Sequence, residues 1–169
     1  AYTPLFFVGR WPVRSVVDLI NIKSRSIQYV KMDYMDTSTL DNALLVAGNY
    51  KTADGEEVPP SSWPVTPLWT SLWLLDELVD FGYTQIDTAF FHAGNYATGE
   101  YNPTIANTWN EGLGIVNYRG WGDANGWHKP YFHRDEVTAL NNGWNLPIVL
   151  SFVCNTGDFG NDYSGTGLD

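Results

Sequence analysis

The residues best suited to chemistry in this 169-residue chain are its one cysteine and its three histidines. Cys154 follows an apolar run, "LPIVLSFV" (146–153), which predicts a strand that ends at the edge of a sheet. A thiol there can attack a carbonyl once a base has removed its proton, and that base is usually a histidine. The candidates are His92, His128 and His133. Each has an ordinary alternative, since a lone cysteine is often a small core residue and a histidine is often a plain surface residue.

A second group of candidates lies in the segment "VNYRGWGDANGWHKPYFH" (116–133), which contains two of the histidines. An apolar stretch runs into a turn formed by Gly120, Trp121 and Gly122, and aromatic residues follow. Trp121 takes no part in proton transfer, because indole is a hydrogen-bond donor only. Trp121 and Trp127 are suited to lining a cleft, since an indole ring buries a large area while its N–H finds a polar partner. The segment therefore predicts a cleft-forming loop.

The elements that must position these residues alternate along the chain. Apolar runs predict strands, and segments with helical periodicity predict helices between them. Strands that are apolar almost throughout are typical of a parallel sheet covered on both faces. We therefore expect one α/β domain over residues 1–169, with a mostly parallel sheet flanked by helices in a three-layer, Rossmann-like architecture. The predicted strands are 5–8, 42–50, 83–91, 113–118 and 146–153, and the predicted helices are 15–32, 68–81, 104–111 and 134–140.

This fold class predicts where a site lies. In open α/β sheets, ligands bind beyond the carboxyl ends of the strands. The loops that follow Tyr118 and Val153 both leave from that edge, so the topology brings segment 116–133 close to Cys154. Residues 51–67 carry four of the nine prolines and predict a long loop, which suggests a functional or inserted segment.

Charge and composition exclude several classes of function. The chain has 9 basic and 19 acidic side chains, and a net charge of −10 argues against a nucleic-acid partner. No apolar run is long enough to span a membrane. A single cysteine excludes an internal disulfide and a cysteine cluster for zinc, and the histidines lack metal-binding spacing. We expect no cofactor, with structural calcium as a minor alternative; its oxygen ligands would be Asp123, Asn125, Asp158, Asn161 and Asp162.

The order of several motifs carries a family resemblance. A strand "GIVNYRG" leads into the Gly-X-Gly turn, a tryptophan follows five residues later, and "LP" opens a strand that runs into the cysteine and "TGDF". This order resembles that of the gingipain-type cysteine peptidases, which are bacterial members of the caspase-like group. The likeness extends upstream through "PLFFVGRWPV", "ALLVAGN" and "LDELVDFGYTQIDT", and so spans most of residues 5–159. The resemblance implies a caspase-like fold.

The resemblance also implies roles for particular residues. Cys154 corresponds to the nucleophile, and the backbone N–H groups of Gly122 and Cys154 correspond to the oxyanion hole. The family has a histidine between the two glycines that protonates the leaving amine, and here Trp121 stands at that position. Three explanations stay open. His128 acts as the base, the chain is a pseudo-peptidase that keeps its cleft for binding, or the thiol works slowly with a weak residual base.

Several further contacts are expected around these residues. Asp123 or Asp135 would orient His128, while Trp121, Trp127 and Asp158 would contact the substrate. A peptidase for basic side chains places a carboxylate at the base of its first pocket. The candidates for that carboxylate are Asp54, Glu56, Glu57, Asp158 and Asp162.

The leading hypothesis is a secreted or cell-surface bacterial cysteine endopeptidase domain that acts on peptides or proteins through Cys154. Family catalytic domains have a further subdomain before the first strand and more sheet after the cysteine strand. We therefore expect this chain to be a fragment or processed piece that pairs with another part of its precursor or with another chain. The alternative is a non-catalytic module whose aromatic cleft binds a peptide or partner. A nucleotide-binding domain is weaker, because no strand leads into a GxGxxG turn.

Overall fold

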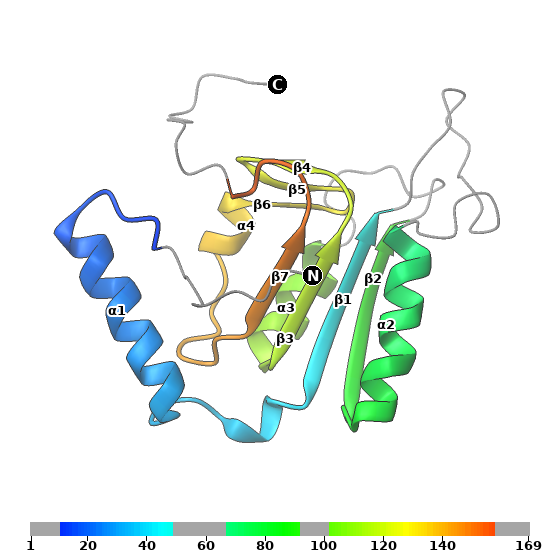
Figure 1. Cartoon of the computed structure of the whole chain (residues 1–169), viewed down its shortest axis with the longest axis horizontal. Coiled ribbons are helices and arrows are strands. Elements are labelled where there is room, and N and C mark those ends of the chain that lie inside the picture. Colours follow the sequence, from blue (N-terminus) through cyan, green and yellow to red (C-terminus); the bar gives the residue numbers. More distant parts are fainter. Residues whose placement is uncertain (1–10, 49–66, 92–101, 158–169) are drawn as a thin grey trace, which may run out of the picture.

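A four-stranded parallel sheet forms the centre of the molecule (Figure 1). The computed structural model describes residues 11–48, 67–91 and 102–157. The strand order is β2-β1-β3-β7, and all three neighbouring pairs are parallel. The mostly parallel sheet predicted from the apolar runs is therefore confirmed. The strands are β1 (Asn42–Gly48), β2 (Gln85–Phe91), β3 (Ile115–Arg119) and β7 (Ile148–Phe152).

Helices cover both faces of this sheet, as the three-layer prediction requires. Helix α2 (Pro67–Phe81) packs on one face, where Leu78 meets the inward side chains of β1. Helix α3 (Asn102–Glu111) and the short α4 (Arg134–Thr138) lie on the other face (Figure 1). Alternate residues of β1 point to opposite faces and residues 43–47 are fully buried, which accounts for the nearly continuous apolar run. We call the two sides the α2 face and the α3 face.

Helix α1 (Val16–Lys31) lies beside the sheet rather than on it (Figure 1). It begins at Ser15, whose hydroxyl accepts a hydrogen bond from the Asp18 N–H at 3.1 Å, as expected of an N-cap. It ends at Met32, which adopts a left-handed conformation with φ 57°. No residue of α1 is buried among the described residues. A 3₁₀ turn, η1 (Thr37–Thr39), then leads into β1.

A second sheet follows β3 directly and was not predicted. Segment 116–133, expected as a loop, contains three short antiparallel strands in the order β4-β5-β6. A tight turn joins the first two, with Asp123 Oδ1 accepting a hydrogen bond from the Asn125 N–H at 2.7 Å. We call this element the cap sheet because it lies over the carboxyl ends of the central strands (Figure 1). Its strands are β4 (Gly122–Asp123), β5 (Gly126–His128) and β6 (Tyr131–His133).

The remaining element predictions differ from the structure mainly at their ends. The strand predicted at 42–50 is described to Gly48, the strand at 83–91 begins at Gln85, and the last helix ends at Thr138 rather than at 140. The strand predicted at 5–8 and the long loop at 51–67 fall outside the described residues, except for Pro67. In the described part of the chain, no helix combines the length and the apolar character needed to cross a membrane.

Candidate active site

The carboxyl ends of β1, β3 and β7 meet the cap sheet at close range. A Cβ atom added to Gly48 would overlap the carbonyl of Lys129. One added to Gly122 would lie 2.5 Å from the Gly126 carbonyl oxygen and 3.0 Å from Val153 Cγ2. The Gly-X-Gly turn therefore packs directly against the residue that precedes Cys154. The prediction that the two loops converge at this edge agrees with this geometry.

The hydroxyl of Tyr118 holds the turn in place. Trp121 N–H donates to Tyr118 Oη at 2.9 Å, and the same hydroxyl lies 2.6 Å from the Trp121 carbonyl oxygen, to which it donates. That carbonyl also accepts from the His128 N–H at 2.8 Å. The Trp121 ring is half exposed, with Lys129 Nζ 5.7 Å from its centroid. The backbone of Trp121 is thus fixed while its indole faces outward.

The pairing of β4 with β5 orients the N–H of Gly122. Gly122 stands opposite Trp127 in this antiparallel pair. Because the His128 N–H bonds to the Trp121 carbonyl, the neighbouring Trp121–His128 pair is at a hydrogen-bonded position. Hydrogen-bonded and non-hydrogen-bonded pairs alternate along an antiparallel ladder. The Gly122 N–H therefore points away from β5, the orientation that a donor to an external oxygen needs.

Cys154 is exposed just beyond the end of β7. Its carbonyl accepts a hydrogen bond from the Thr156 N–H at 2.8 Å, and Asn155 between them has φ 56°, so the chain turns sharply after the thiol. Side chains of β7 alternate between the two faces of the sheet, and Val153 packs into the α3-face core. Cys154 itself lies beyond the last residue of β7, in the turn at the carboxyl edge of the sheet. Its thiol forms no hydrogen bond with any described residue.

Asp123, His128 and His133 form a connected group on the cap sheet. His128 Nε2 lies 3.1 Å from Asp123 Oδ2, and His128 Nδ1 lies 3.1 Å from His133 Nε2. If His128 is neutral and donates to Asp123 through Nε2, its Nδ1 is an acceptor and His133 Nε2–H is the donor. The lone pair that a base would use is then occupied by His133. The expected carboxylate partner of His128 is thus Asp123, not Asp135.

The electrostatics of this group follow from burial and close neighbours. Burial raises the pKa of Asp123, but the Asn125 N–H and then His128 outweigh it and hold that pKa below its ordinary value. Burial, followed by the nearby His128, lowers the pKa of His133. Burial also raises the pKa of Tyr131, whose ring centroid is 3.8 Å from that of His133. The group therefore favours a carboxylate at Asp123 and a neutral imidazole at His133 near neutral pH.

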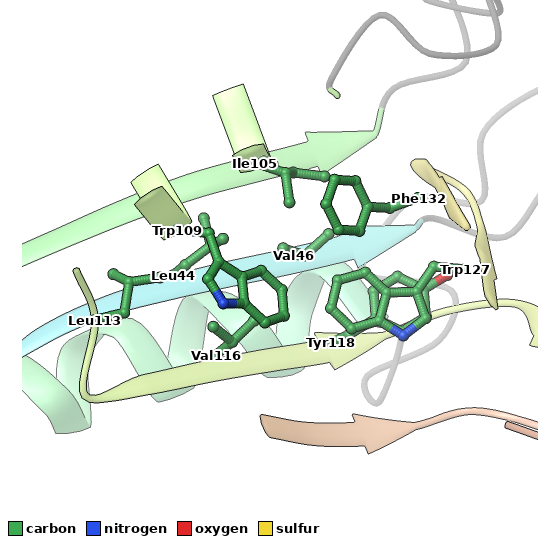
Figure 2. Close-up of a cluster of buried hydrophobic side chains, with 10 residues drawn as sticks. Leu44, Val46, Ile105, Trp109, Leu113, Val116, Tyr118, Trp127 and Phe132 are labelled. Carbon is green, nitrogen blue, oxygen red and sulfur yellow. The ribbon is translucent and has the colours of Figure 1, made fainter. Parts of the chain in front are cut away.

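Trp127 is mainly a core residue and not an open cleft wall (Figure 2). Its side chain is almost entirely buried, and it stacks on Tyr118 with ring centroids 4.3 Å apart. Its indole N–H donates to Ser151 Oγ at 3.0 Å, and Ser151 Oγ is 3.3 Å from Thr156 Oγ1. This chain of contacts ties the cap sheet to β7 and to the turn after Cys154. Sequence reasoning missed Ser151, Thr156 and Tyr118, since none has a chemical signature of its own.

A pocket of about 650 Å³ opens beside these residues on the α3 face. Its apolar wall includes Trp109, Phe132 and Val149, and an edge of Trp127 contributes to it. Asp123 and His133 supply polar atoms, and Cys154 does not line it. The thiol is therefore not part of this pocket, although Thr156, two residues later, lines it.

The other predicted site residues have mixed outcomes. His92 and Asp158 lie outside the described residues, as do the acidic candidates Asp54, Glu56, Glu57 and Asp162. In the described ranges, no group of three or more histidine, cysteine or acidic side chains is arranged to hold a metal ion. The calcium site stays a prediction, because three of its five suggested ligands are not described.

Known proteins share both the sequence pattern and the fold. The chain is 28% identical over 153 residues to gingipain R2 of Porphyromonas gingivalis, a match covering 90% of this chain and 19% of that protein. It is 26% identical to Lys-gingipain of the same organism over 158 residues, which is 94% of this chain and 8% of that protein. This chain therefore spans about a fifth of the length of these relatives or less.

Two solved structures have the same fold. The crystal structure of the Arg specific cysteine proteinase gingipain R (RGPB) matches with a TM-score of 0.70 and 23% identity, over 92% of this chain and 33% of that chain. The complex of Porphyromonas gingivalis RgpB pro- and mature domains matches with a TM-score of 0.71 and 23% identity, over 94% of this chain and 34% of that chain. The family model described as Peptidase family C25 matches residues 1–168 of this chain. Because this match covers nearly the whole sequence, the chain belongs to Peptidase family C25.

Proposed function

We propose that this chain is part of a secreted or cell-surface bacterial cysteine endopeptidase, with Cys154 as its nucleophile. The observation that supports the proposal is the packing of the Gly-X-Gly turn, which includes Gly122, against Val153, the residue that precedes the exposed Cys154. Membership of Peptidase family C25 supports the reaction class, and the gingipain relatives support the location.

The proposed reaction follows from this arrangement. The Cys154 thiolate attacks the carbonyl carbon of a peptide bond, and the oxyanion accepts hydrogen bonds from the N–H groups of Gly122 and Cys154. Each such donor contributes on the order of 3 kcal/mol to the barrier reduction. A proton passes to the leaving amine, and water then hydrolyses the acyl-enzyme. The reaction needs no cofactor.

The proposed acid/base is His128, held by Asp123. Its Nδ1 must first leave His133, since that nitrogen is engaged in the described arrangement. Removing His133 would free His128, whereas removing His128 would remove the base. The proposal therefore expects His128→Ala to lower kcat/KM for a peptide substrate by at least about 100-fold, while His133→Ala retains most activity. Equal loss in both variants, or activity retained in His128→Ala, would contradict the role of His128.

The nucleophile can be tested without a known substrate. Iodoacetamide at neutral pH should alkylate Cys154 in the native protein, and Cys154→Ala should remove both labelling and cleavage. Labelling that occurs only after unfolding would overturn the nucleophile proposal. Mass spectrometry of the labelled peptide gives the readout.

A second candidate function is a non-catalytic module that binds a peptide or partner. Two observations favour it. Neither described histidine has a ring nitrogen bonded to the thiol, and the 650 Å³ pocket offers a largely apolar surface. Trp121→His separates the two functions. The half-exposed indole leaves room for the change, so gain of cleavage would mean that only the acid/base was missing. An inactive variant that still binds peptides would favour the binding module.

We further propose that this chain pairs with another part of its precursor or with another chain. Strand β7 has a described neighbour on one side only, and its side chains Ile148 and Phe152 are 51% and 60% exposed. An apolar edge strand is a ready site for strand pairing. The relative whose pro- and mature domains form a complex offers a precedent. Analytical ultracentrifugation of the chain with and without the adjoining parts of its precursor would test the pairing.

A further inference from the structure

Arg119 occupies an unusual position at the carboxyl edge of the sheet. It is the last residue of β3 and is partly buried. Its guanidinium Nη1 donates to Thr70 Oγ1 on α2 at 2.9 Å. It forms no ion pair with any described residue, although the chain has twice as many acidic as basic side chains. Guanidinium groups that are partly removed from water usually have a carboxylate or phosphate partner. The guanidinium N–H groups of Arg119 that do not bond to Thr70 are therefore available to bind a ligand.

Register places Arg119 beside the candidate nucleophile. Arg119 pairs with Phe152 across β3 and β7, so the two side chains point to the same face. The bond to Thr70 identifies that side as the α2 face. Cys154 follows Phe152 by two residues, in the turn just beyond the end of β7 and at the same edge of the sheet. Arg119 and Phe152 are about one strand spacing apart, ~4.8 Å, and at most about two extended residues, ~6.6 Å, separate Phe152 from Cys154. A single substrate residue spans such a distance.

Among the described residues near Cys154, Arg119 is the best candidate to bind a carboxylate of the substrate. The polar group formed by Asp123, His128 and His133 belongs to the cap sheet on the α3 face. The 650 Å³ pocket also lies on that face. Arg119 presents a fork of donors that fits the two oxygens of a carboxylate, and Thr70 fixes one arm of that fork. A basic side chain has no acceptor for these donors, and a neutral amide offers only one uncharged oxygen.

We propose that Arg119 binds the carboxylate of an acidic substrate side chain, Asp or Glu, next to the peptide bond presented to Cys154. This inference rests on the proposed peptidase function, and it names the substrate class of the same site. It predicts a preference for acidic peptides in a protein whose overall charge is −10, because the local guanidinium outweighs the screened repulsion of distant surface carboxylates.

Peptide binding to the full-length Cys154→Ala protein tests the inference without requiring catalysis. The probes are two capped hexapeptide libraries, identical except for a central Glu or Gln, so that the side chain alone carries the charge. The Glu library should bind about tenfold more tightly or better, as expected for a charge-assisted hydrogen bond. Arg119→Gln should remove the difference, and Arg119→Lys should retain part of it. Arg25→Gln, which removes the same charge from exposed α1, should leave the preference intact.

Three outcomes would overturn the inference. They are equal binding of the two libraries, no binding of either, and a Glu preference that survives Arg119→Gln. Thermal unfolding of each variant shows whether a lost preference comes from a lost fold, and the partial preference in Arg119→Lys separates ligand binding from a purely structural role.

Thiol alkylation separates this inference from the nucleophile proposal. With Cys154 intact, the rate ratio of anionic iodoacetate to neutral iodoacetamide should fall severalfold in Arg119→Gln. A native thiol that reacts with neither reagent would count against Cys154 as the nucleophile. The peptide libraries would still test whether Arg119 binds a carboxylate, because that measurement does not depend on the thiol. A reactive thiol with an unchanged ratio would count against Arg119 alone.

Discussion

The two faces of the central sheet differ at its carboxyl edge. On the α3 face, the cap sheet packs against α3 and its polar groups are bonded to one another. On the α2 face, Arg119 and Phe152 are partly or largely exposed. The exposed thiol of Cys154, just beyond the end of β7, forms no hydrogen bond with a described residue. At this edge, the tightly packed and hydrogen-bonded groups are therefore separate from the exposed groups. The α3 face holds the backbone of the Gly-X-Gly turn through Tyr118, while the α2 face is more exposed at this edge.

The largest expected difference concerns one aromatic side chain from each face. Trp127→Ala removes a buried ring from the α3-face core and breaks the bond to Ser151, so it should reduce the free energy of unfolding by about 3–5 kcal/mol. Phe152→Ala removes a ring that is 60% exposed, and should cost less than about 1 kcal/mol. Urea unfolding of both variants gives the measurement. Similar losses would mean that the α2 face is also tightly packed in solution.

An intermediate effect is expected from a single hydroxyl. Tyr118→Phe leaves the Trp121 N–H and carbonyl without their Tyr118 partner, so unfolding should become easier by about 1–3 kcal/mol. Tyr83→Phe is the matched control, because Tyr83 packs on the α2-face core and its hydroxyl has no hydrogen bond to a described residue. That control should change stability by less than about 0.5 kcal/mol. Equal effects would show that the Tyr118 hydroxyl does not hold the turn.

The smallest expected effect is a change in pH dependence. Burial, and then His128, lower the pKa of His133 in the folded state; Asp123, Asp135 and Glu136 oppose this shift but do not cancel it. The unfolded chain therefore binds a proton first as the pH falls, so stability is full above the ordinary histidine pKa of about 6.5 and declines below it.

His133→Gln tests this pH dependence by removing the titrating group. The free energy of unfolding of the parent protein should decrease from pH 7.5 to pH 5.5, and the variant should show a shallower decrease over the same interval. The slope is the diagnostic quantity, because the variant also loses the contact with His128 at every pH. A parent protein that becomes more stable toward pH 5.5 would contradict the assigned direction.

The sheet and the edge that carries the site could be predicted because both follow from apolar runs. Residues 43–47 and 148–152 form strands whose order along the chain already places the loops after Tyr118 and Val153 together. The cap sheet could not be predicted, since strands of two or three residues are too short to show an alternating pattern. The sequence did not single out Arg119 either, because its face is known only from its bond to Thr70 on α2 and its register with β7.

The pairing of the two histidines depended on the same unseen sheet. His128 and His133 are five residues apart, and only the β5–β6 register brings their rings within hydrogen-bond distance. The sequence offered Asp123 or Asp135 as the partner of His128, and the structure has Asp123; nothing in the sequence indicated that the second ring nitrogen was occupied. Trp127 was expected to line a cleft because of its size, and its burial depends on the fold of the cap sheet around Tyr118.

The contacts from Trp127 through Ser151 to Thr156 have a mechanical consequence. The indole N–H and the two hydroxyls couple the cap sheet to the turn that follows Cys154. The turn cannot shift toward an arriving substrate without either stretching these bonds or carrying the cap sheet with it. We therefore expect the distance between the Gly122 N–H and the Cys154 thiol to stay nearly constant when these loops move.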